Sequence, residues 1–332
     1  MSTGAGASDL LHAEDTGITD LVEGKAPVAA RSPLQLFWLR FRRDKVAMGA
    51  LCFIVLLIIV AILAEPIRKL VGAPAPNVQE TSALDPAFGL PRGPSSAHIF
   101  GADQIGRDVF SRVLAGAQVS LKVAFIGTGM SVILGTIIGM IAGFYRGWID
   151  TAISRTIDVL LAFPVLLLAL GLATACSGKD GCVNGLLQPG LPVVIFIIII
   201  ANCPYVARII RGQVLSLREK EFVEAARSLG ASNPRIIFRE ILPNLVAPII
   251  VYTSLFVPAN ILLEAALSFL GVGVPPGQPS WGQMLSDASE IFDSAWWYMF
   301  FPGMALLLTV LAFNLVGDGL QDALNPKGTR NS

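Results

Sequence analysis

Long apolar stretches alternate with short polar segments along most of this 332-residue chain. A helix needs roughly 20 mostly apolar residues to cross the hydrocarbon core of a bilayer. Six windows satisfy that length: residues 46–66, 119–145, 157–175, 191–211, 245–270 and 297–317. The pattern therefore predicts an all-α, polytopic integral membrane protein with six transmembrane helices in a domain spanning residues 46–325.

The composition supports this fold class. Hydrophobic residues make up 54% of the chain and charged residues 14%, whereas ordinary soluble domains contain about 25% charged residues. The formal net charge is zero, which argues against nucleic acid as a partner.

Two segments precede the first span. Residues 1–32 are rich in glycine, alanine and serine, contain several acids and have no apolar core, which predicts a disordered cytosolic tail. Residues 33–45 combine aromatic and basic side chains, so we expect an interfacial helix that contacts membrane lipid.

Lysine and arginine lie mainly on one of the two sides that six spans define. That side holds Arg40, Arg42, Arg43, Lys45, Arg146, Arg155, Arg208, Arg211, Arg218, Lys220, Arg227, Arg235 and Arg239. Cytosolic loops are enriched in these two residue types. Both termini and the loop 212–244 are therefore predicted to be cytosolic, and the long loop 67–117 is predicted to lie outside the cell membrane.

The polar stretch 217–244 predicts two short helices that meet at an angle. The first, 219–229, contains strong helix formers and has apolar residues on one side: Phe222, Ala226 and Leu229. Gly230 ends it, because glycine readily adopts the left-handed conformation that closes a helix. The second helix is predicted to open with Pro234 after a cap at Ser232 or Asn233, and to end near Pro243.

From the composition alone, this stretch could lie on the lipid headgroups or dock a cytosolic protein. Its spaced residues resemble the signature loop of permease subunits of ABC importers, although Glu240 stands where that pattern has an aliphatic residue. The matching positions are Glu224, Ala225, Ala226, Gly230, Leu242 and Pro243. The resemblance implies that a coupling helix docks in a groove of an ATPase through Glu221, Phe222, Glu224, Ala225, Ala226, Leu229 and Gly230.

The end of the long outer loop carries opposite charges four residues apart. Asp103 and Arg107, then Asp108 and Arg112, have the spacing that brings side chains together on one face of a helix. The pattern GxDxxGRDxxSR resembles the peptide and nickel branch of these permeases, specifically the C-type subunit of oligopeptide or dipeptide importers. The resemblance implies that Asp103, Arg107 and Asp108 lie near the outer mouth of the pathway.

Two acids lie in or beside predicted spans, where an ionisable side chain needs a partner, water or a function. We expect Asp158 to form a structural pair with Arg155, with a gating role as the alternative. For Glu264, the two interpretations are a buried pair with an outer arginine such as Arg107 and a polar lining of the pathway.

Cys176 and Cys182 lie in a short glycine-containing loop that the topology places on the oxidising side, so a disulfide is expected. A metal site is less favoured because no histidine is nearby in the sequence. Cys52 and Cys203 lie within spans and are interpreted as packing residues.

No GxxxxGK[ST] phosphate loop occurs in the chain, so a non-catalytic subunit without a bound cofactor is expected. The resemblance implies partners in a bacterial inner membrane: a second homologous permease, two ATPase subunits that use ATP and Mg, and an extracytoplasmic substrate-binding protein. It implies import of oligopeptides or dipeptides, with nickel or another small solute as the alternative. A self-contained, ion-coupled secondary transporter is the rival class, but only Glu264 and Asp158 could supply its carboxylates.

Overall fold

The computed structural model describes residues 33–324, except residues 177, 179–180, 183–184, 186, 189 and 276. The chain divides into two units, Met1–Arg40 and Phe41–Ser332. The described part of the first unit lies in α2 (Pro33–Phe41), and the predicted tail at residues 1–32 lies outside the described residues. All further helices belong to the second unit.

The predicted interfacial helix 33–45 is shorter than expected, because α2 ends at Phe41. Asp44 instead caps the next helix: its carboxylate accepts hydrogen bonds from the amides of Val46 at 2.9 Å and Ala47 at 3.1 Å. Aspartate is favoured at this position because it satisfies amides that have no partner within the helix.

Among the described residues, five helical runs are long and apolar enough to cross a membrane. They are α3 (Lys45–Ile62), α5 (Val109–Tyr145), α8 (Leu191–Leu217), the run Asn233–Phe269 and α13 (Trp296–Leu324). A sixth crossing requires α6 (Gly147–Ala162) and α7 (Val165–Ala175) together, and these two helices meet at 89°. The predicted continuous helix 157–175 is therefore wrong. Pro164 has no N–H and disfavours helical backbone at Phe163, which is extended here.

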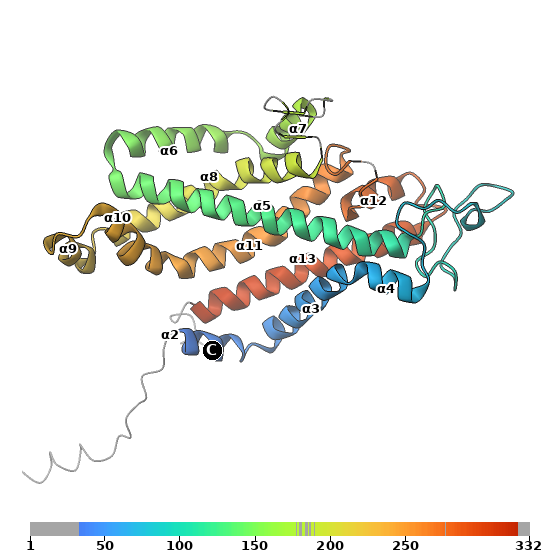
Figure 1. Cartoon of the computed structure of the whole chain (residues 1–332), viewed down its shortest axis with the longest axis horizontal. Coiled ribbons are helices and arrows are strands. Elements are labelled where there is room, and N and C mark those ends of the chain that lie inside the picture. Colours follow the sequence, from blue (N-terminus) through green and yellow to red (C-terminus); the bar gives the residue numbers. More distant parts are fainter. Residues whose placement is uncertain are drawn as a thin grey trace, which may run out of the picture. The chain divides into compact units, whose positions relative to one another are not determined.

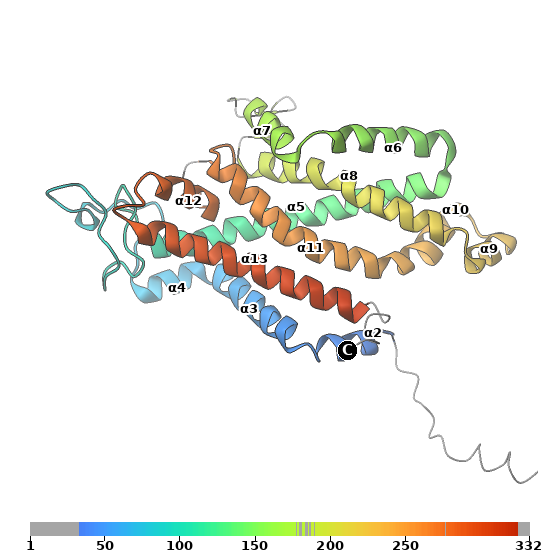
Figure 2. The same ribbon diagram turned by 180° about the vertical axis from the view of Figure 1, so that it is seen from behind.

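Shorter elements connect the long helices. They are α4 (Ala64–Val71), the single turn η1 (Thr81–Ala83), α9 (Glu221–Ser228), α10 (Asn233–Arg235), the π-helix η2 (Ile236–Ile241), α11 (Leu242–Phe269) and α12 (Trp281–Ser289). The loop expected at 67–117 is reduced to residues 72–108, because α4 and α5 take up its two ends. In the second unit, α9 and this loop lie at opposite ends of the long helices (Figures 1 and 2).

Helices α5 and α8 pack against each other and run side by side in both views (Figures 1 and 2). Glycines of α5 permit this approach. A Cβ atom on Gly135 would lie 2.6 Å from Val206 Cβ, and one on Gly139 would lie 2.5 Å from the Ala207 carbonyl oxygen. Small residues allow membrane helices to pack at backbone contact, so these positions fix the distance between α5 and α8.

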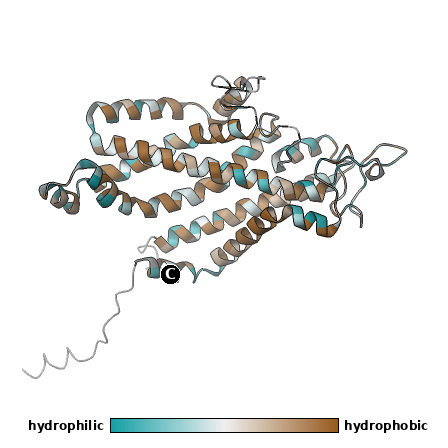
Figure 3. Cartoon of the chain, in the orientation of Figure 1, coloured by the Kyte–Doolittle hydropathy of each residue, from teal (hydrophilic) through white to brown (hydrophobic). Residues whose placement is uncertain are grey.

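Apolar residues follow the long helices, whereas polar residues gather at the ends (Figure 3). The hydrophilic segments include α9–α10 at one end and parts of α4 and the neighbouring loop at the other. This distribution agrees with helices that span a membrane and polar segments that meet water on its two sides.

Candidate functional sites

Helix α9 forms where the sequence predicts the first short helix. It runs from Glu221 to Ser228, and Gly230 follows with φ +77°. The amide of Ala231 donates to the carbonyl of Ala226 at 3.0 Å, and the amide of Gly230 donates to Arg227 at 3.0 Å. These bonds satisfy carbonyls at the helix end in the usual glycine-terminated manner.

The side of α9 that packs against the fold is centred on Val223. Val223 is fully buried, and Ala226 packs against the same cluster, which includes Phe144, Val214 and Ile236. Phe222 is 38% exposed and Leu229 is 88% exposed, so these two apolar residues do not pack against the rest of the fold. Val223 packs α9 against the ends of α5 and α8, while Phe222 and Leu229 lie on the surface.

The proposed coupling residues are therefore presented outward. Glu221, Phe222, Glu224, Ala225, Leu229 and Gly230 are all exposed, and Ala226 is half-buried. Exposed large apolar side chains beside small ones suit a surface that another protein covers. Their role in coupling remains a prediction.

The second predicted helix does not end near Pro243. It begins at Asn233, passes through the π-helix η2 and continues without interruption to Phe269. Pro243 is accommodated in the first turn of α11, directly after the π-helix, where the regular hydrogen-bond ladder is already shifted. The helical segment that follows α9 is thus continuous with a spanning helix.

Charged side chains connect the segment between α8 and α9 to the end of α5. Arg218 donates to the carbonyl of Phe144 at 2.5 Å, and Arg146 pairs with Glu219 at 2.5 Å. Arg146 is the one non-glycine residue with positive φ, at 52°, in the described part of the chain. These contacts connect the α5–α6 turn to the segment that leads into α9.

At the other end, Asp103 is fully buried and organises the outer charges. It accepts hydrogen bonds from Arg107 Nε at 2.6 Å and from the Arg107 amide at 2.8 Å. Arg107 also lies 3.7 Å from Asp287 of α12, which accepts a hydrogen bond from Tyr298 at 3.2 Å. Burial raises the pKa of the Asp287 carboxyl, and Tyr298 and the arginines Arg112 and Arg107 oppose that rise. The predicted Asp103–Arg107 pair is present, but in a turn before α5 instead of on a helix face.

The second predicted outer pair, Asp108 with Arg112, is wrong because Asp108 caps α5. Its carboxylate accepts from the Ser111 amide at 2.8 Å and lies 3.1 Å from His98 Nδ1. Arg112 lies 3.7 Å from Asp103 instead. Asp108 and Arg112 thus reach different partners from the same helix turn.

Glu264 is fully buried on α11. Its carboxyl oxygens accept hydrogen bonds from Ser120 of α5 and from Ser268, both at 2.8 Å. The expected pair with Arg107 is therefore wrong, since Arg107 binds Asp103 and Asp287. Through these two hydrogen bonds Glu264 connects α11 to α5. Because its side chain is fully buried, Glu264 is not exposed to a pathway in this structure.

Cys176 and Cys182 form a disulfide in the loop after α7, with their Cα atoms 4.8 Å apart. Cys176 is buried in a cluster with Val194 and Leu267. The disulfide therefore links the loop to packed residues of α8 and α11. Cys52 and Cys203 are free.

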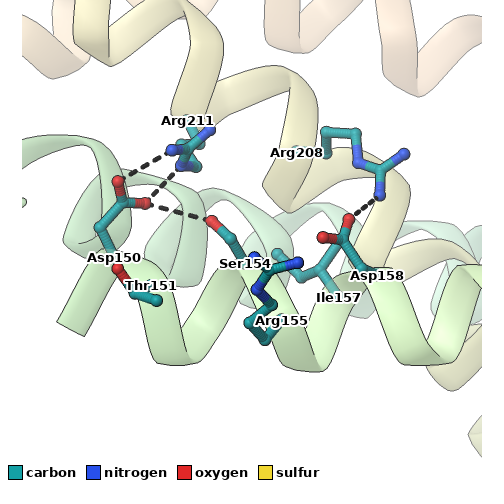
Figure 4. Close-up of a pocket in the computed structure, with 8 residues that line it drawn as sticks. All are labelled: Asp150, Thr151, Ser154, Arg155, Ile157, Asp158, Arg208 and Arg211. Carbon is teal, nitrogen blue, oxygen red and sulfur yellow. Dashed lines mark hydrogen bonds and ion pairs between the residues drawn. The ribbon is translucent and has the colours of Figure 1, made fainter. Parts of the chain in front are cut away.

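A charged groove separates α6 from α8 near their common end (Figure 4). The open groove has a volume of about 370 Å³. Arg208 pairs with Asp158 at 2.5 Å, so the expected partner Arg155 is wrong. Arg211 pairs with Asp150 through two contacts, one of them 2.8 Å long.

Several of these residues were not predicted from the sequence. The sequence does contain an indication that Val223 is buried, because Val223 and Ala226 are three residues apart and lie on one side of a helix. Arg208, Arg211 and Asp150 also had a signal: opposite charges within or beside apolar windows need partners. His98, Asp287 and Tyr298 had none, because no motif or helical spacing connects these residues with their partners.

Family comparisons match most of the chain. Residues 135–330 match the family described as binding-protein-dependent transport system inner membrane component. Residues 32–77 match the N-terminal TM domain of oligopeptide transport permease C.

Two individual relatives are similar to this chain over most of its length. The dipeptide transport system permease protein DppC of Alkalihalophilus pseudofirmus is 42% identical over 298 residues, which is 90% of this chain and 91% of the relative. The glutathione transport system permease protein GsiD of Pectobacterium atrosepticum is 40% identical over 299 residues, covering 90% of this chain and 93% of that protein.

Among solved structures, a chain from inward-facing conformations of the MetNI methionine ABC transporter is similar with a TM-score of 0.52. The sequences are 17% identical, and the match covers 64% of this chain and 96% of that chain. At this identity the likeness concerns the fold alone.

Proposed function

The chain belongs to the permease subunits of ABC importers, and we propose that it forms half of the path by which a bacterium imports peptides. The substrate class rests on the relatives, which are named as dipeptide and glutathione permeases. A second permease of the same family supplies the other half, and an extracytoplasmic binding protein delivers the peptide.

Helix α9 carries this proposal. Its outer surface presents Glu224, Ala225 and Leu229, while Val223 fixes it to the ends of α5 and α8. A separate ATPase subunit seats on this exposed surface, because the chain has no phosphate loop of its own. The positively charged residues around α9 support a cytosolic location for this helix, where ATP is present.

Movement of α9 reaches the membrane through two rigid connections. The cluster around Val223 includes Phe144 of α5, Val214 of α8 and Ile241 of η2. The helix from Asn233 to Phe269 then continues directly into a span. When ATP draws two ATPase subunits together, α9 therefore shifts packed helices as a body and alternates access to the path.

The experiment replaces Glu224 with alanine in the assembled importer and measures ATPase co-purification and ATP-driven dipeptide uptake separately. Loss of a contact residue at the centre of an interface weakens association on the order of tenfold. Glu290→Ala is the matched control, since Glu290 is an exposed glutamate beside α12 at the other end of the helices.

Unchanged association and uptake in Glu224→Ala and in a second variant, Gly230→Ala, would contradict coupling through α9. ATP-dependent uptake of nickel in place of peptide would leave the coupling intact and overturn the substrate class. Uptake driven by an ion gradient without ATP would overturn both.

A further inference from the structure

The groove between α6 and α8 carries charged pairs that stay in contact with solvent. The side chains of Arg208 and Asp158 are 52% and 53% exposed, although they bind each other at 2.5 Å. The pair Arg211–Asp150 is more covered, at 30% and 17%. Figure 4 shows that α6 contributes the acids and α8 the arginines, on surfaces that face one another.

The pair Arg208–Asp158 lies further from the helix ends than Asp150, which is in the first turn of α6. The close approach of Gly139 to the Ala207 carbonyl places Arg208 level with Gly139 of α5. Beyond that level α5 continues to Tyr145, about 9 Å further at 1.5 Å per residue. Exposed side chains of α5 on either side of this level are apolar: Ile137 and Ile141. The pair Arg208–Asp158 is therefore not at the rim where headgroups begin.

The break between α6 and α7 gives a second, independent observation. Phe163 is 54% exposed, and Pro164 beside it is exposed as well. Pro164 has no N–H, so the carbonyl of Leu160 lacks its helical donor. The 16 residues of α6 put this break about 24 Å from the start of the helix, within reach of the roughly 30 Å hydrocarbon core.

Neither feature is compatible with lipid chains. A charged side chain at the centre of a bilayer costs about 2.5–3.5 kcal/mol by insertion measurements. Broken helical backbone at membrane depth is tolerated where it is buried in protein or lines a water-filled cavity. This face of α6 and α8 is therefore turned away from the bilayer.

We propose that the face bearing Asp158–Arg208 and Asp150–Arg211 lines the water-filled translocation path in the half nearest α9. The groove presents fixed charges of both signs, which suits solutes that carry both an ammonium and a carboxylate, as peptides do at neutral pH. The assignment rests on the proposed function and names the surface that the transported peptide passes.

A covering protein is the main competing explanation for the exposed pairs. Complete burial of an ion pair removes its hydration, and the mutual attraction frequently fails to compensate for that loss. The pairs here keep about half of the Arg208 and Asp158 surfaces open beside a cavity of about 370 Å³. A space of this size has room for water molecules, which would supply the hydration that a covering protein removes.

Thiol labelling in the assembled importer tests the proposal. Asp158→Cys and Thr156→Cys are made with Cys52 and Cys203 replaced by serine, because those two cysteines are free. Thr156 is the matched control: it is exposed, and its hydroxyl donates to Ala152 within the same helix at 3.0 Å. The two positions lie about 160° apart around α6 at 3.6 residues per turn.

A membrane-impermeant, cationic methanethiosulfonate reagent is applied from the side on which α9 lies. Asp158→Cys should react about tenfold or more faster than Thr156→Cys, because thiolate formation is suppressed in apolar surroundings. Ser154→Cys keeps both ion pairs and lines the same groove, so it gives the same comparison if Asp158→Cys assembles poorly. Transported dipeptide should slow the labelling at both groove positions.

Labelling no faster in the groove than at Thr156, in complexes that still import peptide, would overturn the proposal and leave the proposed function standing. Absence of ATP-driven uptake in the unmodified complex would instead reject the proposed function itself. Fast labelling that dipeptide does not slow would overturn the assignment to the translocation path, since it would show a wet surface outside it.

Discussion

The Ser120 hydroxyl donates a hydrogen bond of 2.8 Å to Glu264, and both residues are fully buried. This bond joins α5 to α11 at a point where Ser268 also donates to the same carboxyl group at 2.8 Å. A buried acid that receives two hydroxyl donors acts as a connector between helices, and its removal leaves both hydroxyls without their acceptor.

Glu264→Ala is expected to destabilise the protein by about 1–3 kcal/mol for the unsatisfied hydroxyls, with a further loss for the space left behind. Glu264→Gln should retain most of the stability, because its amide oxygen still accepts one of the two bonds. Thermal unfolding of the purified complex measures both. Equal melting temperatures for Glu264→Ala and wild type would show that this connection does not stabilise the fold.

Val223 and Leu229 should separate the stability of α9 from its proposed docking. Val223→Ala removes buried methyl groups and is expected to lower stability by about 1–2 kcal/mol. Leu229→Ala changes a side chain that is 88% exposed, so stability should change by no more than about 0.5 kcal/mol. Thermal unfolding is measured beside ATPase co-purification, and only Leu229→Ala should weaken association at unchanged stability. The opposite assignment of the two effects would contradict the orientation of α9.

Gly230→Ala should disturb the turn after α9, because its φ of +77° is unfavourable for a residue with a side chain. The expected cost is about 1–2 kcal/mol. Gly212→Ala is the control: Gly212 is helical, and nothing lies within 4 Å of the added Cβ atom, so it should be neutral or slightly stabilising. Thermal unfolding and uptake are compared for both variants, and equal effects would argue against a conformational requirement at residue 230.

Gly139→Ala should separate α5 from α8. The added Cβ atom would lie 2.5 Å from the Ala207 carbonyl oxygen, which is backbone and cannot move alone. Overpacking of this kind costs about 1–3 kcal/mol. Gly129→Ala is the control in the same helix, because its Cβ atom meets nothing within 4 Å. A lower melting temperature is expected for Gly139→Ala alone, because alanine favours a helix more than glycine does and Gly129→Ala adds no close contact. A similar decrease for Gly129→Ala would show that the loss does not come from the contact with α8.

Local sequence was sufficient for the properties that depend on neighbours along the chain. The lengths of the apolar runs at α3, α5, α8 and α13 predicted spanning helices. Residues 219–229 and the following Gly230 predicted α9 and its end, because helix formers and a terminating glycine act within a few residues. These features need no knowledge of what packs against them.

Continuity of helices was less predictable. Pro164 breaks a predicted span by 89°, whereas Pro243 is absorbed into a long run from Asn233. Both prolines lack an amide donor, and the difference depends on whether the neighbouring turns can rearrange. At Pro243, the π-helix before it provides that rearrangement.

The sequence by itself determined the membrane-spanning class, the charged ends and the outward helix α9, since hydropathy and short-range conformation are properties of contiguous residues. The tertiary structure alone decided the partners of the charged groups: Asp158 binds Arg208, Asp108 reaches His98, and Glu264 binds Ser120. Sequence spacing favoured local or charged partners for these acids. An ionisable group within packed helices is satisfied by whichever donor the packing brings within reach, and that donor lies on another helix or on a separate loop.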